Sequence, residues 1–155
     1  MLKKIMLVPL LIITTEISGF ALHPNDITLT GSEKSEVITI KWETLANVEW
    51  KWDGDFYEAV FSKEAKELNG REVIVEGFMF PLEYSRKHKT FLLSSTPMSD
   101  CFFCGPGEAE SMVYILSDEP VDYKTSQFKM KGTFKLVEDT SMGILYQLEN
   151  AVPVE

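Results

Sequence analysis

Two cysteines stand three positions apart in the sequence, as Cys101-Phe102-Phe103-Cys104. In an oxidising compartment such a pair can form a disulfide, and two thiolates at this spacing can also bind one side of a zinc ion. Thiol–disulfide catalysis needs a helix N-terminus at the first cysteine, but Gly105-Pro106-Gly107 follows and would break a helix. Covalent haem attachment needs a histidine where Gly105 stands. A disulfide and a metal site are therefore the two chemistries that the motif supports best.

A closed zinc site needs four ligands, and the cysteines supply two. His88 or Glu108 would provide further donors, with Asp100 and Glu110 as additional candidates. His88 lies in a run of basic residues, 86–89, which we interpret first as a solvated turn and second as part of a metal site. A single Cys-x-x-Cys motif is a weak zinc signal. The predicted metal ligands are Cys101, Cys104, His88 and Glu108, and the alternative is a Cys101–Cys104 disulfide.

Aromatic residues are concentrated in two places. Phe102 and Phe103 separate the two thiols, where an exposed ring would contact a partner. The stretch 42–61 also contains six aromatic residues, Trp50 and Trp52 among them, in a segment that we expect to be mostly irregular. We interpret this stretch as large side chains packed over a core. The alternative is a contact surface formed by Phe102, Phe103, Trp50 and Trp52.

The N-terminal residues resemble a secretory signal. Lys3 and Lys4 precede an apolar run over residues 5–13, and Gly19-Phe20-Ala21 offers a cleavage site. The apolar run is far shorter than the roughly 20 residues of a membrane-spanning helix. We therefore expect a signal peptide over 1–21, a flexible arm over 22–36, and one domain over 37–155. The expected location is periplasmic or extracellular, with no membrane anchor after cleavage.

The chain is acidic, with 24 acidic and 15 basic residues and a net charge of −9. Removal of Lys3, Lys4 and Glu16 with the signal would leave 23 acidic and 13 basic residues, and a net charge of −10. A surface of this sign repels phosphate groups. We therefore expect no nucleic acid partner and no binding to anionic membranes.

Alternating apolar residues predict a mainly β fold. A strand is expected over 37–42, and a short helix over 62–68, capped by Ser62 and stopped at Asn69-Gly70. Gly77 would let the first long strand bend strongly. The connection 118–126 contains Pro120 and cannot be a long helix. Five further strands are expected over 71–82, 90–94, 112–116, 127–137 and 143–148.

This order of strands is typical of a small five-stranded Greek-key barrel of the OB type. The N-terminal extension and the one short helix would lie outside the barrel. An open sandwich is the alternative. Closure is favoured because it removes strand edges that would otherwise pair between molecules.

Several motifs together resemble the bacterial exported family called domain of unknown function 3299. The resemblance covers the chain from Trp42 to the C-terminus. It rests on Trp42 with Leu45, Leu68-Asn69-Gly70, Val75-x-Gly77-Phe78-Met79-x-Pro81-Leu82, Phe91-Leu92-Leu93, and Cys101-Phe102-Phe103-Cys104-Gly105 with Pro106 and Glu108.

The family has no established activity. Some members resemble lipoproteins encoded beside export or zinc-acquisition systems, so the resemblance implies a role in extracytoplasmic metal handling. This chain differs from those members because it has no lipid-attachment cysteine. In other members the second cysteine is replaced and a histidine lies nearby, which raises metal binding to the level of the disulfide.

We therefore expect an exported, non-catalytic binding module that handles zinc through Cys101 and Cys104. The alternative is an interaction or scaffold protein with a structural Cys101–Cys104 disulfide and an aromatic contact loop. The partner would be a metal ion or an extracytoplasmic protein. An enzyme is not expected, because the sequence has no Ser-His-Asp spacing and no glycine-rich phosphate loop.

Overall fold

The computed structural model describes residues 37–97 and 108–155. These residues belong to one compact unit, Ser35–Glu155. The predicted signal peptide and arm, over 1–36, lie outside the described residues, and so does the segment 98–107 with both cysteines. Within the described part of the chain, no helix is long and apolar enough to cross a membrane.

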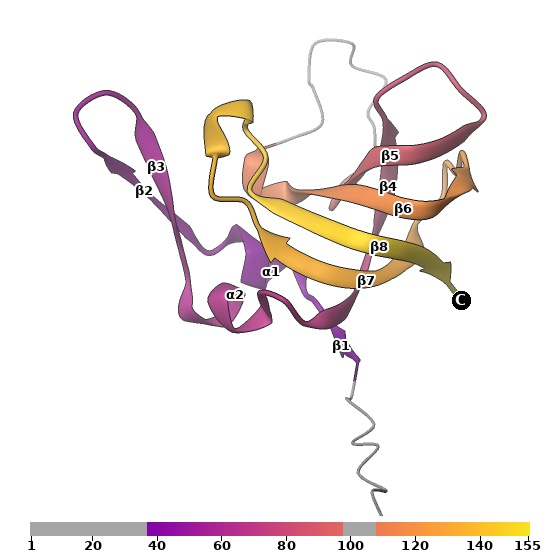
Figure 1. Ribbon diagram of the computed structural model, residues 1–155, viewed down its shortest axis with the longest axis horizontal. Coiled ribbons are helices and arrows are strands. Elements are labelled where there is room, and N and C mark those ends of the chain that lie inside the picture. The colour runs from indigo at the N-terminus through magenta and orange to yellow at the C-terminus, as the bar shows by residue number, and fades with distance from the viewer. Residues whose placement is uncertain (1–36, 98–107) are drawn as a thin grey trace, which may run out of the picture. The chain divides into compact units, whose positions relative to one another are not determined.

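Five strands form a closed barrel (Figure 1). They pair in the order β4-β5-β6-β8-β7, and β7 pairs again with β4. All neighbours are antiparallel except β6 and β8, which are parallel. This is the strand order of an OB barrel, so the predicted fold is confirmed. The strands are β4 (Glu72–Pro81), β5 (Lys87–Ser94), β6 (Met112–Asp122), β7 (Phe128–Leu136) and β8 (Tyr146–Val154).

The interior of the barrel is built by the alternation that the sequence shows. Alternate residues of β4 and β7 are buried, and their neighbours point outward. The buried side chains form one apolar cluster. Its fully buried members include Val73, Val75, Phe91, Met130 and Phe134.

Three of the strands are longer than their patterns indicated, and one of them, β8, covers Tyr146–Val154 where a strand over 143–148 was expected. β5 begins at Lys87 instead of residue 90, and β6 continues to Asp122 through Pro120. The β5–β6 register shifts between His88 and Thr90, which pair with Val121 and Leu116. Pro120 therefore lies in a bulge, where its missing N–H removes no ladder hydrogen bond.

The residues before β4 cover the barrel with small elements. β1 (Ile38–Thr39) pairs parallel with β4, and α1 (Trp42–Ala46) follows. The predicted strand over 37–42 is thus right only for β1. Trp42 donates its indole Nε1–H to the carbonyl of Glu76 at 2.8 Å, which holds α1 against β4.

The predicted short helix is confirmed as α2 (Lys63–Leu68). The Ser62 side chain accepts a hydrogen bond from the Ala65 N–H at 3.2 Å, which caps the first turn. Gly70 has a φ of 81°, the left-handed conformation that stops a helix. Between the helices, β2 (Val48–Trp52) and β3 (Tyr57–Phe61) form a separate two-stranded sheet.

Two glycines allow the strands to cross closely inside the barrel. A Cβ atom on Gly77 would lie 2.5 Å from the carbonyl oxygen of Ser94, and one on Gly132 would lie 2.6 Å from that of Glu149. Real Cβ atoms do not approach backbone oxygens so closely. Both positions therefore require glycine for space, as predicted for Gly77.

We expect Gly77→Ala to lower the free energy of unfolding by about 2–3 kcal/mol, because a backbone oxygen must move to make room. Urea unfolding followed by tryptophan fluorescence measures this change. Lys135→Ala on the outward face of β7 is the matched control, with an expected change of about 0.5 kcal/mol or less. Equal stability of Gly77→Ala and wild type would show that the strands are not so close.

Candidate functional site

The segment with the cysteines joins β5 to β6, and both of its ends are fixed. The Ser95 N–H donates to the Ser111 carbonyl at 3.0 Å. The Ser111 hydroxyl donates to the Glu108 carbonyl at 2.7 Å, at the start of the short 3-10 helix η1 (Ala109–Ser111). Cys101, Phe102, Phe103 and Cys104 lie outside the described residues. The disulfide and the zinc site therefore stay predictions.

Tyr146 connects the elements at this end of the barrel. Its side chain is fully buried, and its hydroxyl donates to the Leu45 carbonyl in α1 at 2.7 Å. Its ring lies 5.6 Å from Phe134 and 5.7 Å from Phe61, centroid to centroid. Burial raises the pKa of the Tyr146 phenol, and the negative charge of Glu110 in η1 raises it further. Tyr146 thus links α1, β3, β7 and η1.

His88 is not in a solvated turn. Its side chain is 0% exposed, and neither ring nitrogen has a hydrogen-bond partner among the described residues. The ring lies edge-on to Tyr123, with centroids 6.3 Å apart. The interpretation as a solvated turn is wrong because β5 begins earlier than expected. The run Lys87-His88-Lys89 alternates as a strand does, with both lysines outside and the imidazole inside.

His88 and Glu108 lie at opposite ends of the β5–β6 ladder. His88 pairs with Val121, whereas Ser94 pairs with Met112, close to Glu108. Ser94 lies six positions after His88 along β5, a length of roughly 20 Å. These two residues therefore cannot bind the same ion. Within residues 37–97 and 108–155, no group of three His, Cys, Asp or Glu side chains could hold a metal ion.

Trp50 and Trp52 lie on the β2–β3 hairpin, and both are exposed. The exposed fractions are 42% for Trp50, 58% for Trp52, 59% for Phe56 and 62% for Tyr57. Trp52 and Tyr57 are opposite each other in the register, with ring centroids 5.1 Å apart. The interpretation of these aromatic residues as core is therefore wrong, because no described element covers the outer part of the hairpin.

One face of the hairpin is apolar along its whole length. Cross-strand partners share a face, and the pairs on this face are Val48 with Phe61, Trp50 with Ala59, and Trp52 with Tyr57. Near the barrel, Val48, Ala59 and Phe61 are half-buried and pack on the core. The outer half, Trp50, Trp52 and Tyr57, is exposed. We call these three residues together with Phe56 the aromatic face.

The tip of the hairpin has a defined conformation. Asp53 accepts hydrogen bonds at Oδ1 from the backbone N–H groups of Asp55, at 2.8 Å, and Phe56, at 2.9 Å. These two donors stabilise the carboxylate and lower the pKa of Asp53. Gly54 has a φ of 119°, which an L side chain rarely adopts. The turn therefore presents an ionised carboxylate beside the aromatic face.

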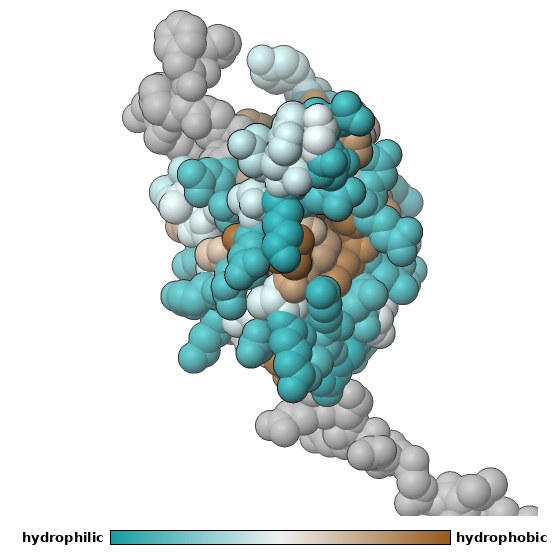
Figure 2. All heavy atoms as spheres, turned by 90° about the vertical axis from the view of Figure 1, so that its left-hand side faces the viewer, coloured by the Kyte–Doolittle hydropathy of each residue, from teal (hydrophilic) through white to brown (hydrophobic). Residues whose placement is uncertain are grey.

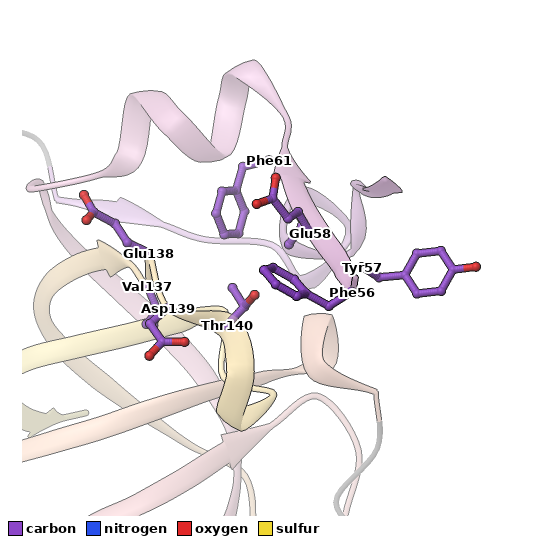
Figure 3. Close-up of a pocket in the computed structure, with 9 residues that line it drawn as sticks. Phe56, Tyr57, Glu58, Phe61, Val137, Glu138, Asp139 and Thr140 are labelled. Atoms are coloured by element: carbon purple, nitrogen blue, oxygen red, sulfur yellow. The ribbon is translucent and has the colours of Figure 1, made fainter. Parts of the chain in front are cut away.

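A groove lies between the hairpin and the loop that joins β7 to β8 (Figure 3). Its volume is about 730 Å³. In Figure 3 the rings of Phe56 and Phe61 turn toward this groove, and the ring of Tyr57 points away from it. The loop contributes Val137, Glu138, Asp139 and Thr140.

Figure 2 views the side of the molecule that carries the hairpin. Hydrophobic surface, drawn in brown, is visible there between hydrophilic side chains, whereas tryptophan and tyrosine fall near the pale middle of this colour scale. The exposed large apolar side chains of the hairpin are Trp50, Trp52, Phe56 and Tyr57. An exposed apolar surface with a polar rim is typical of an interaction site.

Comparison with known proteins supports the fold. A DUF3299 family protein from Pseudomonas aeruginosa PAO1, known from its crystal structure, aligns with a TM-score of 0.54 at 19% sequence identity. The alignment covers 77% of this chain and 97% of that one. The two proteins share a fold. This finding confirms, for the fold, the resemblance drawn from the sequence motifs. No family model and no curated protein matches the chain.

Phe56, Tyr57 and the carboxylates of the β7–β8 loop were not among the contact residues predicted from the sequence. A signal for the hairpin was present, because Val48 to Trp52 alternates and an Asp-Gly pair follows. No local signal places residues 137–140 beside the hairpin, since this contact depends on the closure of the barrel.

We expect Tyr146→Phe to lower the free energy of unfolding by about 1–3 kcal/mol, because it leaves the buried carbonyl of Leu45 without its donor. The difference from wild type should narrow above about pH 10, the pKa of a free tyrosine. Above that pH the unfolded wild type releases a proton that the folded protein retains, so only the wild type loses stability through this group.

Urea unfolding at neutral and alkaline pH measures both effects. Tyr84→Phe is the control, because Tyr84 is fully exposed and should change stability at neither pH. A Tyr146→Phe variant as stable as wild type at neutral pH would contradict the role of this hydrogen bond.

We expect His88→Leu to raise the free energy of unfolding by about 1–2 kcal/mol, because leucine removes two buried nitrogens that lack partners while filling a similar volume. Thermal and urea unfolding of the variant test this. His88→Lys should be strongly destabilising, because it would bury an unpaired charge. A loss of stability in His88→Leu would show that the imidazole has a polar partner in solution.

Proposed function

We propose that this protein is an exported, non-catalytic binding module that holds a polypeptide partner against the aromatic face of the β2–β3 hairpin. Export is supported by the signal-like residues 1–21 of the sequence. A non-catalytic role is supported by the kind of side chain involved, since aromatic rings bind by contact and stacking.

The observation that carries the proposal is the continuity of the apolar face. Its inner half packs on the core, and its outer half projects into solvent with large aromatic side chains. Single exposed aromatic residues are common, but four together on one element are not. Trp and Tyr are also the residues most enriched among those that dominate binding energy at protein interfaces.

The hairpin itself gives a second argument. β2 and β3 pair only with each other among the described strands, and an isolated two-stranded hairpin is marginally stable in water. Here its base is held by the contact of Phe61 with Tyr146. A partner that covered Trp50, Trp52 and Tyr57 would supply the apolar contact that the outer half lacks.

Zinc binding through Cys101 and Cys104 stays a prediction of the sequence. The described geometry gives it no added support, because the other two predicted ligands, His88 and Glu108, lie at opposite ends of a ladder. A disulfide between the cysteines is equally a prediction, and it is compatible with the proposed binding module.

A photo-crosslinking amino acid placed at Tyr57 in the exporting cell should give a discrete adduct with one polypeptide. The same amino acid at Tyr84, which is fully exposed on the loop between β4 and β5, should not. Mass spectrometry identifies the polypeptide, which is then produced in pure form.

Binding of the purified polypeptide should weaken at least about tenfold in the double variant Trp50→Ser/Trp52→Ser, because exposed anchors of this type dominate interfaces. Unfolding of this variant should change by about 1 kcal/mol or less, since both side chains are exposed. Tyr84→Ser is the matched control and should bind as wild type does. Equal adducts at both positions, or wild-type affinity of the double variant, would overturn the proposal.

A further inference from the structure

Carboxylates surround the aromatic face. Asp53 and Asp55 form the hairpin tip, and Glu138 lies across the groove on the β7–β8 loop. The residues that line the groove include no lysine, arginine or histidine. The surface around the aromatic face is therefore strongly negative.

Within the described part of the chain, no ion pair is found for Asp53, Asp55 or Glu138. The ion pairs found there, Lys63 with Glu67 and Lys131 with Glu72, lie outside the hairpin and the groove. Lys51 is the one basic residue between 48 and 61. It stands opposite Glu58 in the register, on the face that does not carry the tryptophans.

Aromatic rings next to carboxylates are the chemistry that recognises a cation. A guanidinium or ammonium group is attracted to the face of an aromatic ring, and a guanidinium also pairs with carboxylates through its planar donors. The protein contains one such contact already, because Lys124 Nζ lies 5.1 Å from the centroid of the Phe128 ring. Among residues 37–97 and 108–155, no cation lies over a ring of the aromatic face.

We propose that the aromatic face and its surrounding carboxylates bind a basic segment of the partner polypeptide, with Arg or Lys side chains stacked on Trp50, Trp52 or Tyr57. This inference rests on the proposed function and specifies the chemistry of the partner. Charge complementarity is the argument for this occupant, because Asp53, Asp55 and Glu138 border the aromatic face and the chain as a whole, with a net charge of −9, offers them little competing positive charge. The same charge opposes a second copy of the chain, nucleic acid or an anionic membrane at this face.

The three tryptophans provide a direct measurement on the full chain. Trp50 and Trp52 lie on the aromatic face, whereas the indole N–H of Trp42 is hydrogen bonded to Glu76. NMR spectra of protein with isotope-labelled tryptophan should show one indole signal for each. A synthetic peptide in which Arg alternates with Ser should shift the signals of Trp50 and Trp52 and leave that of Trp42 in place.

Matched peptides separate charge from other contacts. The same peptide with citrulline for Arg keeps the shape and loses the charge, so it should bind at least about fivefold more weakly. A Glu-for-Arg peptide should not bind. Raising sodium chloride from about 50 mM to about 500 mM should lower the affinity for the Arg peptide several-fold, because salt screens exposed charges.

Charge variants locate the effect on the surface. The double variant Asp55→Asn/Glu138→Gln should bind the Arg peptide several-fold more weakly than wild type does. Asp118→Asn/Glu119→Gln removes the same number of charges from exposed positions near the His88 end of β6 and should not. If both variants weaken binding equally, the attraction comes from the overall charge and the inference is overturned.

The remaining outcomes of the peptide experiment also test the inference. If the citrulline peptide binds as tightly as the Arg peptide, the inference fails, whereas the proposed binding module stands. If no peptide shifts Trp50 or Trp52, the inference fails, and the module is judged by its crosslinked partner alone. If only the NMR signal of Trp42 shifts, the peptide binds away from the aromatic face and the inference is overturned.

Discussion

Pairing of β4 with β7 converts a sheet into a barrel, and the other elements take their positions from it. The ladder runs through six consecutive pairs, from Glu72 with Thr133 to Gly77 with Phe128. It requires a strongly bent β4, and Gly77 allows the bend because Ser94 comes too close for any side chain there. Closure also removes the free edges that an open sheet of this size would expose.

The closed barrel places the hairpin and the β7–β8 loop beside one groove. Closure brings the end of β7 and the start of β8 to the end of the barrel at which β6 starts, directly after η1. Tyr146, the first residue of β8, then reaches α1 through Leu45 and the base of the hairpin through Phe61. A hydrogen bond and two ring contacts around one buried phenol thus determine where the aromatic face starts.

The sequence predicted the barrel well because most of its strands carry a period-two pattern, which indicates the inward face of each, and because β5 stands out as a short apolar run. It predicted α2 for a similar local reason, since Ser62 and Gly70 act within one turn of the helix. The exposure of Trp50 and Trp52 was not predictable in this way. Exposure depends on whether a distant element covers a side chain, and an aromatic residue has the same local pattern in either case. His88 was misjudged for the opposite reason, because its basic neighbours suggested solvent while the strand turned it inward.

Among the described strands, β2 and β3 pair only with each other, so each has a free outer edge. These free edges affect how the protein behaves at high concentration. A bare β-edge with aromatic side chains is a template for intermolecular sheet growth. The negative charges of Asp53, Asp55 and Glu58 on the hairpin oppose this growth, because they repel the same charges on a second copy. The hydrogen bonds that Asp53 accepts from the backbone of Phe56 and Asp55 lower its pKa, so this carboxylate keeps its charge as the solution becomes acidic. The tip of the hairpin therefore keeps a negative charge at a pH where an ordinary aspartate begins to lose its own, which opposes edge-to-edge association between two copies of the chain.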